Sequence, residues 1–446
     1  MSTHLIIVSF LYTVFSIGAI IVEIRNIGRI RKIAIISLCR LMFAVILGLI
    51  PALLCYGQVI DPRTRSVIDF SDKAIWTFYI QFLLTVISYL TMNFGYMVKQ
   101  KVPKVHEKLG AEKVVLASLV YLFISAVALY LWGSAFGGLD RLLEQAEWIR
   151  AGVILPTNSF AFFKHFAPLA LLTSFLLFNV LLHKQVRGFK KLVTYIMLAV
   201  SVGLSSIYLQ ASDGRLMFAS YILIFFLVYF AYQYEEKKMP LGKMAIRMIP
   251  ILIIVTIVLF NAGTILRSLR GTESLGEKSN GRTIWDTIYG EFFFIVAGQQ
   301  GAIEGAVSGE TKLMIVNDIV NGLFAWLPTS LTPFKLESVW TYNTRLITPG
   351  ATGTNPTSLV AQSVYDLGMI GVLVIPALFG ALIRKTERIL DSFPDSTFAK
   401  TVYMVLGFYL CRAIAYFSLY SIMIETFFIF LGIAIYAVLM RIRTSR

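Results

Sequence analysis

The sequence predicts an all-α polytopic membrane protein, and three observations lead to that prediction. Of its 446 residues, 57% are apolar and only 15% are charged, whereas soluble domains are nearer half apolar and a quarter charged. The apolar residues gather in runs of about 20, the length that a helix needs to cross the hydrocarbon core. The runs lack the ten-residue alternation of a membrane β-barrel, and lipid cannot satisfy the edge of an open sheet.

These runs predict about eleven transmembrane helices. They cover residues 4–23, 33–60, 74–98, 114–133, 161–183, 191–210, 214–234, 246–266, 358–383, 399–418 and 420–440. The chain therefore divides into eight helices in residues 1–266, a large loop at 267–357, and three helices in 358–446.

The basic residues predict the orientation of the chain in the membrane. Lys and Arg are concentrated after the first, third, fifth, seventh and ninth spans and at the carboxyl terminus. Loops rich in these residues stay in the cytoplasm, so the amino terminus and the large loop are predicted to be periplasmic and the carboxyl terminus cytoplasmic. The net charge of +15 is then a consequence of topology, and a nucleic-acid partner is not predicted.

The amino-terminal span is predicted to be a membrane anchor. No basic segment precedes it, and IRNIGRIRK follows it, an arrangement unlike that of a cleaved signal peptide. A metal or cofactor site is not predicted. Cys39, Cys55 and Cys411 all fall within spans, the four histidines are scattered, and no nucleotide-binding loop is present.

The large loop is the predicted place for chemistry. Its segments EFFFIVAGQQGAIEGAV and IVNDIVNGLFAWLP are too short or too glycine-rich to span, so we expect short interfacial or re-entrant helices over a cavity. The segment TPGATGTNPTSL then breaks the chain before the ninth span. The alternative is a packed periplasmic cap without a substrate.

Four basic residues lie within predicted spans, where a charge costs at least about 2.5–3.5 kcal/mol at the bilayer centre. Arg40 is near the cytoplasmic end of its span, so its stem can carry the charge to water. Lys164 sits at an outer end and serves as an anchor or as a ligand contact. Arg215 follows Gly214 and opens the seventh span, where a helix amino terminus favours anions.

Arg412 lies well inside the tenth span, and Glu425 in the next span is its expected partner if the role is structural. Arg267 and Arg270 leave the outer end of the eighth span three residues apart, which places them on one helix face or leaves them as solvated end charges. Guanidinium groups bind pyrophosphate through paired hydrogen bonds and stay charged when desolvated. The arginines together predict an anion site at the outer face.

The chain resembles the Wzy-type oligosaccharide repeat-unit polymerases of the O-antigen polymerase and ligase superfamily. The resemblance is carried by SDGRLMF, LRSLRG, FAWLPTSLTP, TNPTSLVAQSVYDLGMIGVLVIP and the arginine of the penultimate hairpin, and it covers roughly residues 190–446. The five amino-terminal spans match the family only in general layout.

The resemblance implies a fold like that of GT-C glycosyltransferases in a bacterial inner membrane. The reaction would move a growing glycan from undecaprenyl pyrophosphate onto a second lipid-linked repeat unit at the periplasmic face, with inversion and without a metal. The implied partners are the undecaprenyl-pyrophosphate-linked oligosaccharide and membrane lipid. A separate chain-length regulator protein is left open.

The resemblance also assigns residues. Arg215 would bind the leaving phosphate, with Arg412 in the same cavity. The resemblance does not identify the general base. Asp366 is placed with the catalytic residues, and the base is left open among Asp366, Asp318, Glu337 and Glu304, since a carboxylate near the acceptor hydroxyl would fit that task. The predicted pyrophosphate- or sugar-binding residues are Arg267, Arg270, Arg345, Lys164, Thr357, Gln362 and Tyr365. Two positions depart from the family, since Thr357 stands where the ligases often have a histidine and Gln362 where many polymerases have a glutamate.

Three other functions compete with the polymerase. An O-antigen-type ligase is disfavoured by the missing histidine. A flippase or transporter for lipid-linked oligosaccharide should carry charges along a path through several helices, whereas the basic cluster is predicted at the outer mouth. A non-catalytic membrane scaffold is compatible with a large aromatic-rich loop.

Overall fold

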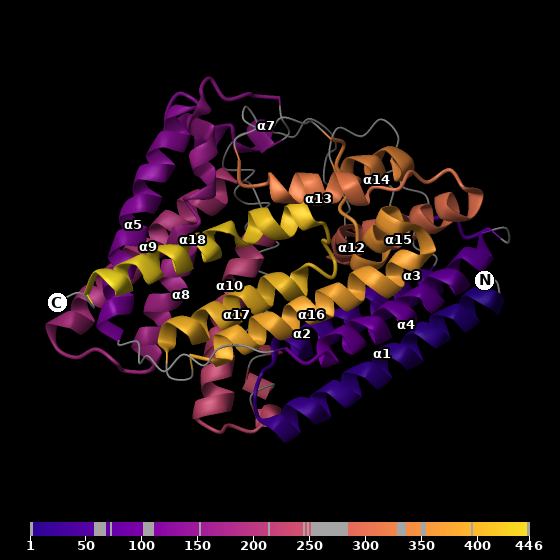
Figure 1. Ribbon diagram of the computed structural model, residues 1–446, viewed down its shortest axis with the longest axis horizontal. Coiled ribbons are helices and arrows are strands. Elements are labelled where there is room, and N and C mark those ends of the chain that lie inside the picture. The colour runs from indigo at the N-terminus through magenta and orange to yellow at the C-terminus, as the bar shows by residue number, and fades with distance from the viewer. Residues whose placement is uncertain are drawn as a thin grey trace. The chain divides into compact units, whose positions relative to one another are not determined.

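The computed structural model describes residues 3–57, 68–71, 74–100, 111–150, 153–212, 215–243, 246–247, 249–250, 284–327, 336–348, 354–393 and 396–443. Nearly all of this part of the chain is helical (Figure 1), and its one β-bridge joins Thr357 to Phe417. The α-helices are α1 (Thr3–Ile30), α2 (Ile35–Ala44), α3 (Ile50–Gly57), α4 (Ile75–Met97), α5 (Ala111–Ser134), α6 (Leu139–Glu144), α7 (Ala146–Arg150), α8 (Leu169–Leu182), α9 (Phe189–Ala211), α10 (Arg215–Ala231), α12 (Ile284–Ser308), α13 (Ile315–Leu323), α14 (Val339–Ile347), α15 (Leu359–Leu367), α16 (Gly371–Asp391), α17 (Thr397–Arg412) and α18 (Leu419–Arg443). Shorter turns are π-helical at Val45–Leu49 and Tyr232–Glu236 and 3₁₀-helical at Ser159–His165 and Gly368–Ile370.

The predicted all-α membrane fold is confirmed. Within the described residues, nine helices are long and apolar enough to cross a membrane, and each matches one of the eleven predicted spans. The predicted span at 246–266 lies mostly outside the described residues. The predicted span at 399–418 corresponds to α17, which has 16 residues and ends at Arg412.

The outer faces of these helices are apolar. Phe10, Leu90, Phe94 and Phe123 are each at least 60% exposed, and such large side chains are scattered along several of the long helices. Soluble monomers rarely expose contiguous apolar surface of this extent. These side chains are placed where lipid covers them in a multi-pass membrane protein.

The chain forms two compact units that do not follow the three predicted parts 1–266, 267–357 and 358–446. Unit 1 comprises Met1–Pro103, Ser279–Ile389 and Gly407–Glu425, and unit 2 comprises Lys104–Lys278, Leu390–Leu406 and Thr426–Arg446. The difference arises because α12, α14 and α15 pack against one another and α12 and α15 against α4. Most of the predicted periplasmic loop that is described is therefore part of the body of unit 1.

The core of unit 1 joins helices that are distant in sequence. Leu5 and Tyr12 of α1, Leu54 of α3, Phe78 of α4 and Phe293 of α12 are buried in one apolar cluster. Helix α12 was predicted to be a short interfacial or re-entrant helix, but it has 25 residues. It is drawn into the core because its apolar side chains find partners on α1, α3 and α4, which removes them from lipid and water alike.

Helices α4 and α16 approach each other at two glycines. A Cβ atom on Gly95 would lie 1.9 Å from the carbonyl oxygen of Ala377, and one on Gly380 would lie 1.9 Å from that of Met92. Small residues let membrane helices bring their backbones together, since dispersion contacts rather than the hydrophobic effect hold them there. The close packing fixes α16, and the start of α16 follows directly from α15.

The predicted ninth span, 358–383, is broken rather than continuous. Helix α15 ends at Gly368, whose φ of 66° and ψ of −159° belong to a region that other residues rarely adopt. The chain then makes a 3₁₀ turn before α16 begins at Gly371. The break leaves α15 as a helix of nine residues whose first eight residues, Leu359–Asp366, are all buried.

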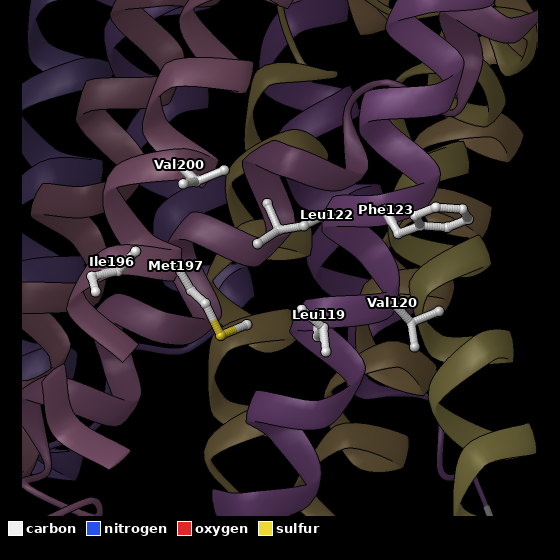
Figure 2. Close-up of a pocket in the computed structure, with 7 residues that line it drawn as sticks. All are labelled: Leu119, Val120, Leu122, Phe123, Ile196, Met197 and Val200. Atoms are coloured by element: carbon white, nitrogen blue, oxygen red, sulfur yellow. The ribbon is translucent and has the colours of Figure 1, made fainter. Parts of the chain in front are cut away.

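Unit 2 is built on contacts of α8 with α5 and α9. The surface of α5 and α9 carries an open groove of about 640 Å³ lined only by apolar side chains. Figure 2 shows these side chains projecting from the two helices. Its lining residues are Leu119, Val120, Leu122, Phe123, Ile196, Met197 and Val200. The groove offers contacts to hydrocarbon and no group for polar chemistry.

A buried ion pair joins α1 to α2 in unit 1. Arg40 Nη1 lies 3.1 Å from Glu23 Oε2, and Arg40 Nε donates to Asn93 Oδ1 of α4 at 2.6 Å. The Glu23 side chain is 1% exposed. Arg40 was expected to extend its charge to the cytoplasmic surface, but the carboxylate and the amide satisfy it within the helix bundle instead.

Replacing Arg40 by Ala should therefore destabilise the protein strongly. The Glu23 carboxylate would keep its burial and lose its cation, a change that typically costs about 3–5 kcal/mol. The matched control is Lys190→Ala, because Lys190 and Glu112 form an ion pair with side chains 68% and 69% exposed, and such pairs contribute less than about 1 kcal/mol. Unfolding of purified protein in detergent measures both; equal losses would contradict a stabilising role for the buried pair.

Candidate functional site

A line of buried polar side chains runs along α15. Thr357 Oγ1 lies 2.7 Å from Gln362 Oε1 and donates toward it, and Gln362 Nε2 donates to both carboxylate oxygens of Asp366 at 3.1 and 3.2 Å. Gln362 and Asp366 are one helical turn apart, so both project from the same face of the helix. The structure thus brings together three of the residues that the sequence predicted as site residues, and all are at most 1% exposed.

The amino-terminal end of α15 is held by other helices of unit 1. Ser358 caps the helix by accepting the N–H of Ala361, and its hydroxyl also accepts from Gln299 Nε2 of α12 at 3.0 Å. Gln299 Oε1 in turn accepts from Gln81 Nε2 of α4 at 2.5 Å. This chain of amides ties the start of α15 to α12 and α4.

A backbone pairing fixes the same end of α15 to the connection between α17 and α18. The N–H of Phe417 donates to the carbonyl of Thr357 at 2.7 Å, and the N–H of Leu359 donates to the carbonyl of Ile414 at 2.9 Å. The Thr357 hydroxyl also lies 2.9 Å from the carbonyl oxygen of Phe417. Arg412 is the last residue of α17 and directly precedes this connection. The backbone pairing therefore brings the end of α17 to the start of α15.

Tyr365 faces the opposite way, into a second polar cluster with α14. Its hydroxyl donates to Asn343 Oδ1 at 2.9 Å, and Asn343 Nδ2 donates to the carbonyl of Asn355. The ring packs edge-on against Tyr342 at 5.6 Å and is fully buried. Tyr365 therefore fixes α14 on α15, and a stacking contact between its ring and a sugar would require these partners to separate.

The four predicted carboxylates differ in their surroundings. Asp318 accepts the N–H of Leu419, the first residue of α18, at 3.0 and 3.2 Å, so it stabilises a helix amino terminus. Glu337 pairs with Arg345 at 2.9 Å, and Glu304 is exposed. Asp366 alone among the four combines deep burial with a side-chain amide as its hydrogen-bond donor. It is therefore the most enclosed of the four carboxylates.

Arg412 and Glu425 form the predicted ion pair. Arg412 Nη1 lies 3.1 Å from Glu425 Oε2, and the guanidinium lies over the ring of Tyr416 at 5.0 Å. Only 11% of the Arg412 side chain and 18% of the Glu425 side chain are exposed. Among the residues that the structure describes, none accepts a hydrogen bond from the buried Nε atom of Arg412, so the guanidinium keeps a donor that this part of the chain does not use.

The other predicted cations are placed separately. Arg345 of α14 is held by Glu337 and lies over the ring of Tyr342. Lys164 is exposed on the 3₁₀ turn of unit 2. Helix α10 begins at Arg215 as predicted, but the Arg215 side chain lies outside the described residues, as do Arg267 and Arg270.

Sequence reasoning missed the amides that hold α15. Gln81 and Gln299 are fully buried, and Gln300 pins residue Asp69 through hydrogen bonds to both its N–H and its carbonyl. Their signal was present in the sequence as polar residues inside apolar runs, QFLLTV and VAGQQGAI. Their pairing could not be inferred, because Gln81 and Gln299 are 218 residues apart.

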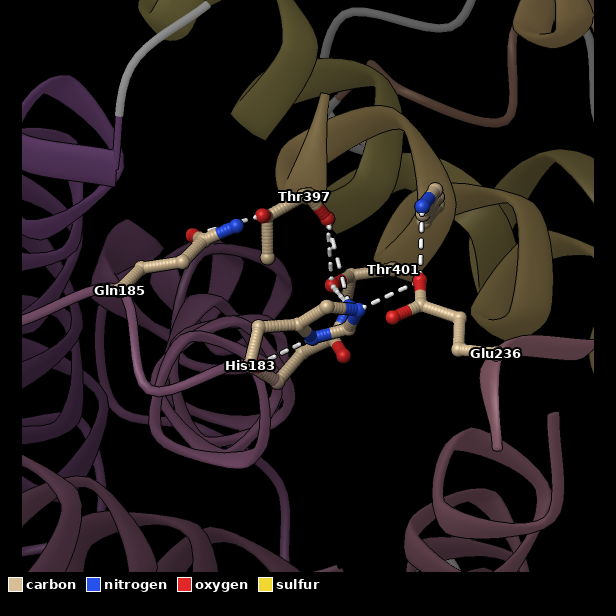
Figure 3. A network of polar contacts seen from close by, with 7 residues as sticks. His183, Gln185, Glu236, Thr397 and Thr401 are labelled. Atoms are coloured by element: carbon tan, nitrogen blue, oxygen red, sulfur yellow. Dashed lines mark hydrogen bonds and ion pairs between the residues drawn. The ribbon is translucent and has the colours of Figure 1, made fainter. Parts of the chain in front are cut away.

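Unit 2 carries a second polar network (Figure 3). His183 Nε2 lies 2.8 Å from Glu236 Oε1, which also accepts from Lys400 Nζ at 2.8 Å. His183 Nδ1 lies 2.8 Å from the carbonyl oxygen of Asn179, so both ring nitrogens lie beside oxygen atoms. The network joins α8, the end of α10 and α17 on the predicted cytoplasmic side, and it serves as a clamp between helices.

Comparison with known proteins adds no relative to this description. No protein-family model, curated protein or solved structure matches the chain. Across the residues that the structure describes, no three His, Cys, Asp or Glu side chains are grouped so as to hold a metal ion. The arrangement on α15 and α17 is therefore interpreted from its own chemistry.

The pKa of Asp318 gives the site a testable pH dependence. Burial raises this pKa to about 6 from its ordinary value of 3.8, against the opposing effect of the Leu419 N–H. A raised carboxyl pKa favours the protonated folded state, so the contribution of Asp318 to stability falls as the pH rises from about 4 to about 6. Asp318→Asn keeps an oxygen for the Leu419 N–H and removes this dependence.

We therefore expect Asp318→Asn to gain stability relative to wild type as the pH rises. The gain is up to about 1.4 kcal/mol for each unit of pKa shift that is removed. Thermal unfolding in detergent at pH 4.5 and pH 7 measures it. A difference in melting temperature between the two proteins that is the same at both pH values would show that Asp318 is not destabilised by its burial.

Proposed function

We propose that the protein is a membrane glycosyltransferase that polymerises undecaprenyl-pyrophosphate-linked oligosaccharide repeat units, like the Wzy-type polymerases that its sequence resembles. The observation that carries the proposal is the line formed by Thr357, just before α15, and by Gln362 and Asp366 on this short and almost wholly buried helix, beside the connection that follows Arg412. Asp366 is the candidate base and Arg412 the candidate anion-binding group, and they come from two neighbouring segments of unit 1.

The proposed reaction is a displacement at the anomeric carbon of the donor glycan. The acceptor hydroxyl oxygen bonds to that carbon, the bond from the carbon to the pyrophosphate oxygen breaks, and undecaprenyl pyrophosphate leaves with the electron pair. The proton of the acceptor hydroxyl passes to the carboxylate of Asp366. General bases must lie within hydrogen-bond reach of the proton that they accept, so the acceptor sugar approaches the α15 line.

Gln362 is proposed to position the base. Its amide donates to both oxygens of Asp366 and leaves the remaining lone pairs of the carboxylate available for an acceptor hydroxyl. Thr357 holds the other end of the Gln362 amide at 2.7 Å, which fixes the orientation of that amide. A glutamine fits this task because it donates to the carboxylate of Asp366 and carries no positive charge. A positive charge would make that carboxylate a weaker base.

Arg412 is proposed to stabilise the charge that develops on the leaving pyrophosphate. Its guanidinium is partly buried, and its Nε is available to donate a hydrogen bond to an anion. The interaction of a charged group with an anion is stronger in a site of low dielectric constant. Arg215, Arg267 and Arg270 are proposed to bind the remaining phosphate oxygens, as the resemblance implies. Together these groups would supply the positive charge that other glycosyltransferases draw from a metal ion.

A flippase or transporter for the same lipid-linked oligosaccharide is the second candidate, and a specific observation favours it. Glu23 and Arg40 place opposite charges within the membrane-spanning helices α1 and α2, and intramembrane charges often mark transport paths. In this protein the two charges neutralise each other, which suits a structural pair better than a path. A ligase remains the alternative within the enzymes.

A surface-glycan gel separates these functions. In a host deleted for the gene, a single repeat unit on the lipid core that grows to long chains only with the wild-type gene supports the polymerase. Loss of the single-unit band would indicate that transport or ligation has failed, and an unchanged ladder would exclude all three functions.

Asp366→Asn should abolish polymerisation and leave the fold intact. The amide conserves volume and accepts from Gln362, but it cannot accept a proton, so we expect the rate to fall by about 10²- to 10⁴-fold. The assay follows polymer length from purified lipid-linked repeat units in detergent. Asp318→Asn is the matched control, since it neutralises another buried carboxylate of unit 1 and should retain polymerisation. Equal activity of Asp366→Asn and wild type would eliminate Asp366 as the base.

The charge of Arg412 can be separated from its ion pair. Arg412→Ala should lower the polymerisation rate by about 10²- to 10³-fold, the loss expected for one oxyanion-stabilising group. Exchanging the pair, as Arg412→Glu with Glu425→Arg, restores an ion pair but moves the guanidinium to α18. We expect the exchange to recover thermal stability without recovering polymerisation. Recovery of both would show that the pair has only a structural role.

A further inference from the structure

Helix α13 of unit 1 is amphipathic with its faces reversed. Its polar side chains point into the protein, where Asp318 accepts from Leu419 N–H, Asn317 donates to the carbonyl of Glu337, and Asn321 donates toward that of Leu336. The opposite side is apolar and between 43% and 67% exposed. The residues of this apolar stripe are Leu313, Val316, Ile319, Leu323 and Leu327.

The spacing of the stripe within α13 is helical. Val316, Ile319 and Leu323 follow one another at intervals of three and four residues, which places them along one side of the helix, and Leu313 and Leu327 lie just before and just after it. Such a stripe on a water-soluble helix faces the protein core. Here the core-facing positions are taken by the aspartate and the two asparagines, so the stripe faces away from unit 1.

The contacts of α13 place it beside the first turns of α18. Asp318 binds the first N–H of α18, and Gly322 allows the side chain of Leu419 to pack against the helix backbone. Trp326 Nε1 donates to the carbonyl of Met423 in the next turn of α18 at 2.8 Å. Helix α18 is long and apolar enough to cross the membrane from Leu419 onward. Helix α13 therefore lies at the end of a span, where tryptophan is enriched.

We propose that α13 is an in-plane interfacial helix that holds its apolar stripe among the acyl chains of the adjacent bilayer leaflet. Bilayer lipid is the occupant that fits, because the side chains of the stripe carry no charge. The stripe also lies beside the first turns of α18, where that helix begins its apolar, membrane-crossing length. Interfacial helices bury their apolar side to the depth of the headgroup and acyl boundary. Helix α13 would take this position whichever reaction unit 1 performs.

This position places lipid and a buried carboxylate on opposite sides of one helix. Asp318 lies on the inner side and within electrostatic range of Asp366, and the stripe lies on the outer side. A lipid-anchored molecule that approaches α13 from the leaflet would meet the stripe first. Helix α13 is thus the lipid-side wall of the α15 region.

Spin labels at single introduced cysteines test the proposal in lipid vesicles of phosphatidylethanolamine and phosphatidylglycerol. Val316→Cys and Leu323→Cys report on the stripe, Leu90→Cys on the exposed apolar surface of α4, and Glu310→Cys on the turn before α13. Labelled wild type gives the background, because Cys39 and Cys55 are buried and Cys411 is half-buried. Collision of each label with oxygen and with a water-soluble nickel chelate gives its depth.

The stripe labels should collide with oxygen several-fold more than with the chelate, as the Leu90 label does, whereas the Glu310 label should show the reverse. Preferential collision of the stripe labels with the chelate would mean that α13 faces water and would overturn the proposal. Weak collision with both reagents would mean that protein, either a second copy or another segment of the chain, covers the stripe, and would also overturn it.

A second measurement leaves α13 unaltered. Lipids brominated near the headgroup end of the acyl chain should quench the fluorescence of Trp326 more than lipids brominated near the chain terminus. The signal of Trp326 is obtained as the difference between wild type and Trp326→Phe, since the chain has six tryptophans. Quenching that is equal in the two proteins would place Trp326 away from lipid and contradict the interfacial position.

Discussion

A polar group buried in a membrane protein must find its partner within the chain, because hydrocarbon supplies none. Unit 1 meets this constraint most densely at the amino-terminal end of α15. There the cap residue Ser358 is held by Gln299, which is held by Gln81, and the backbone of Thr357 is paired with Phe417. This cluster joins α4, α12, α15 and the α17–α18 connection through hydrogen bonds, in addition to their apolar contacts.

The same cluster explains why a nine-residue helix is stable as a buried element. Isolated helices of this length are marginal because nucleation is costly, but α15 is capped at Ser358 and stopped at Gly368, and Tyr365 attaches its last turn to Asn343. A helix fixed at both ends allows its side chains little freedom. Asp366 and Gln362 are therefore held in one geometry, which is the requirement for a preorganised polar site.

The sequence predicted the fold from its strongest signal, apolar runs of membrane-crossing length, and that signal located nine spans among the described residues. It could not predict the break in the ninth span, because the apolar run continues across Gly368 and only the backbone conformation ends the helix. It named Thr357, Gln362 and Asp366 as candidate site residues but assigned Thr357 to the loop and the other two to the ninth span, whereas hydrogen bonds join all three along α15. The link from Gln81 to Ser358 depends on tertiary packing and leaves no pattern in a single sequence.

Two partly buried arginines, Arg40 and Arg412, differ in how completely the protein satisfies their hydrogen-bond donors. Arg40 uses Nε for Asn93 and Nη1 for Glu23, so the protein satisfies it from two helices. Arg412 has the Glu425 carboxylate, but its Nε has no partner within the described part of the chain. An unsatisfied buried donor costs about 1–3 kcal/mol, and proteins tend to accept such costs at functional sites. This difference is the reason why Arg412, and not Arg40, is proposed to bind the pyrophosphate.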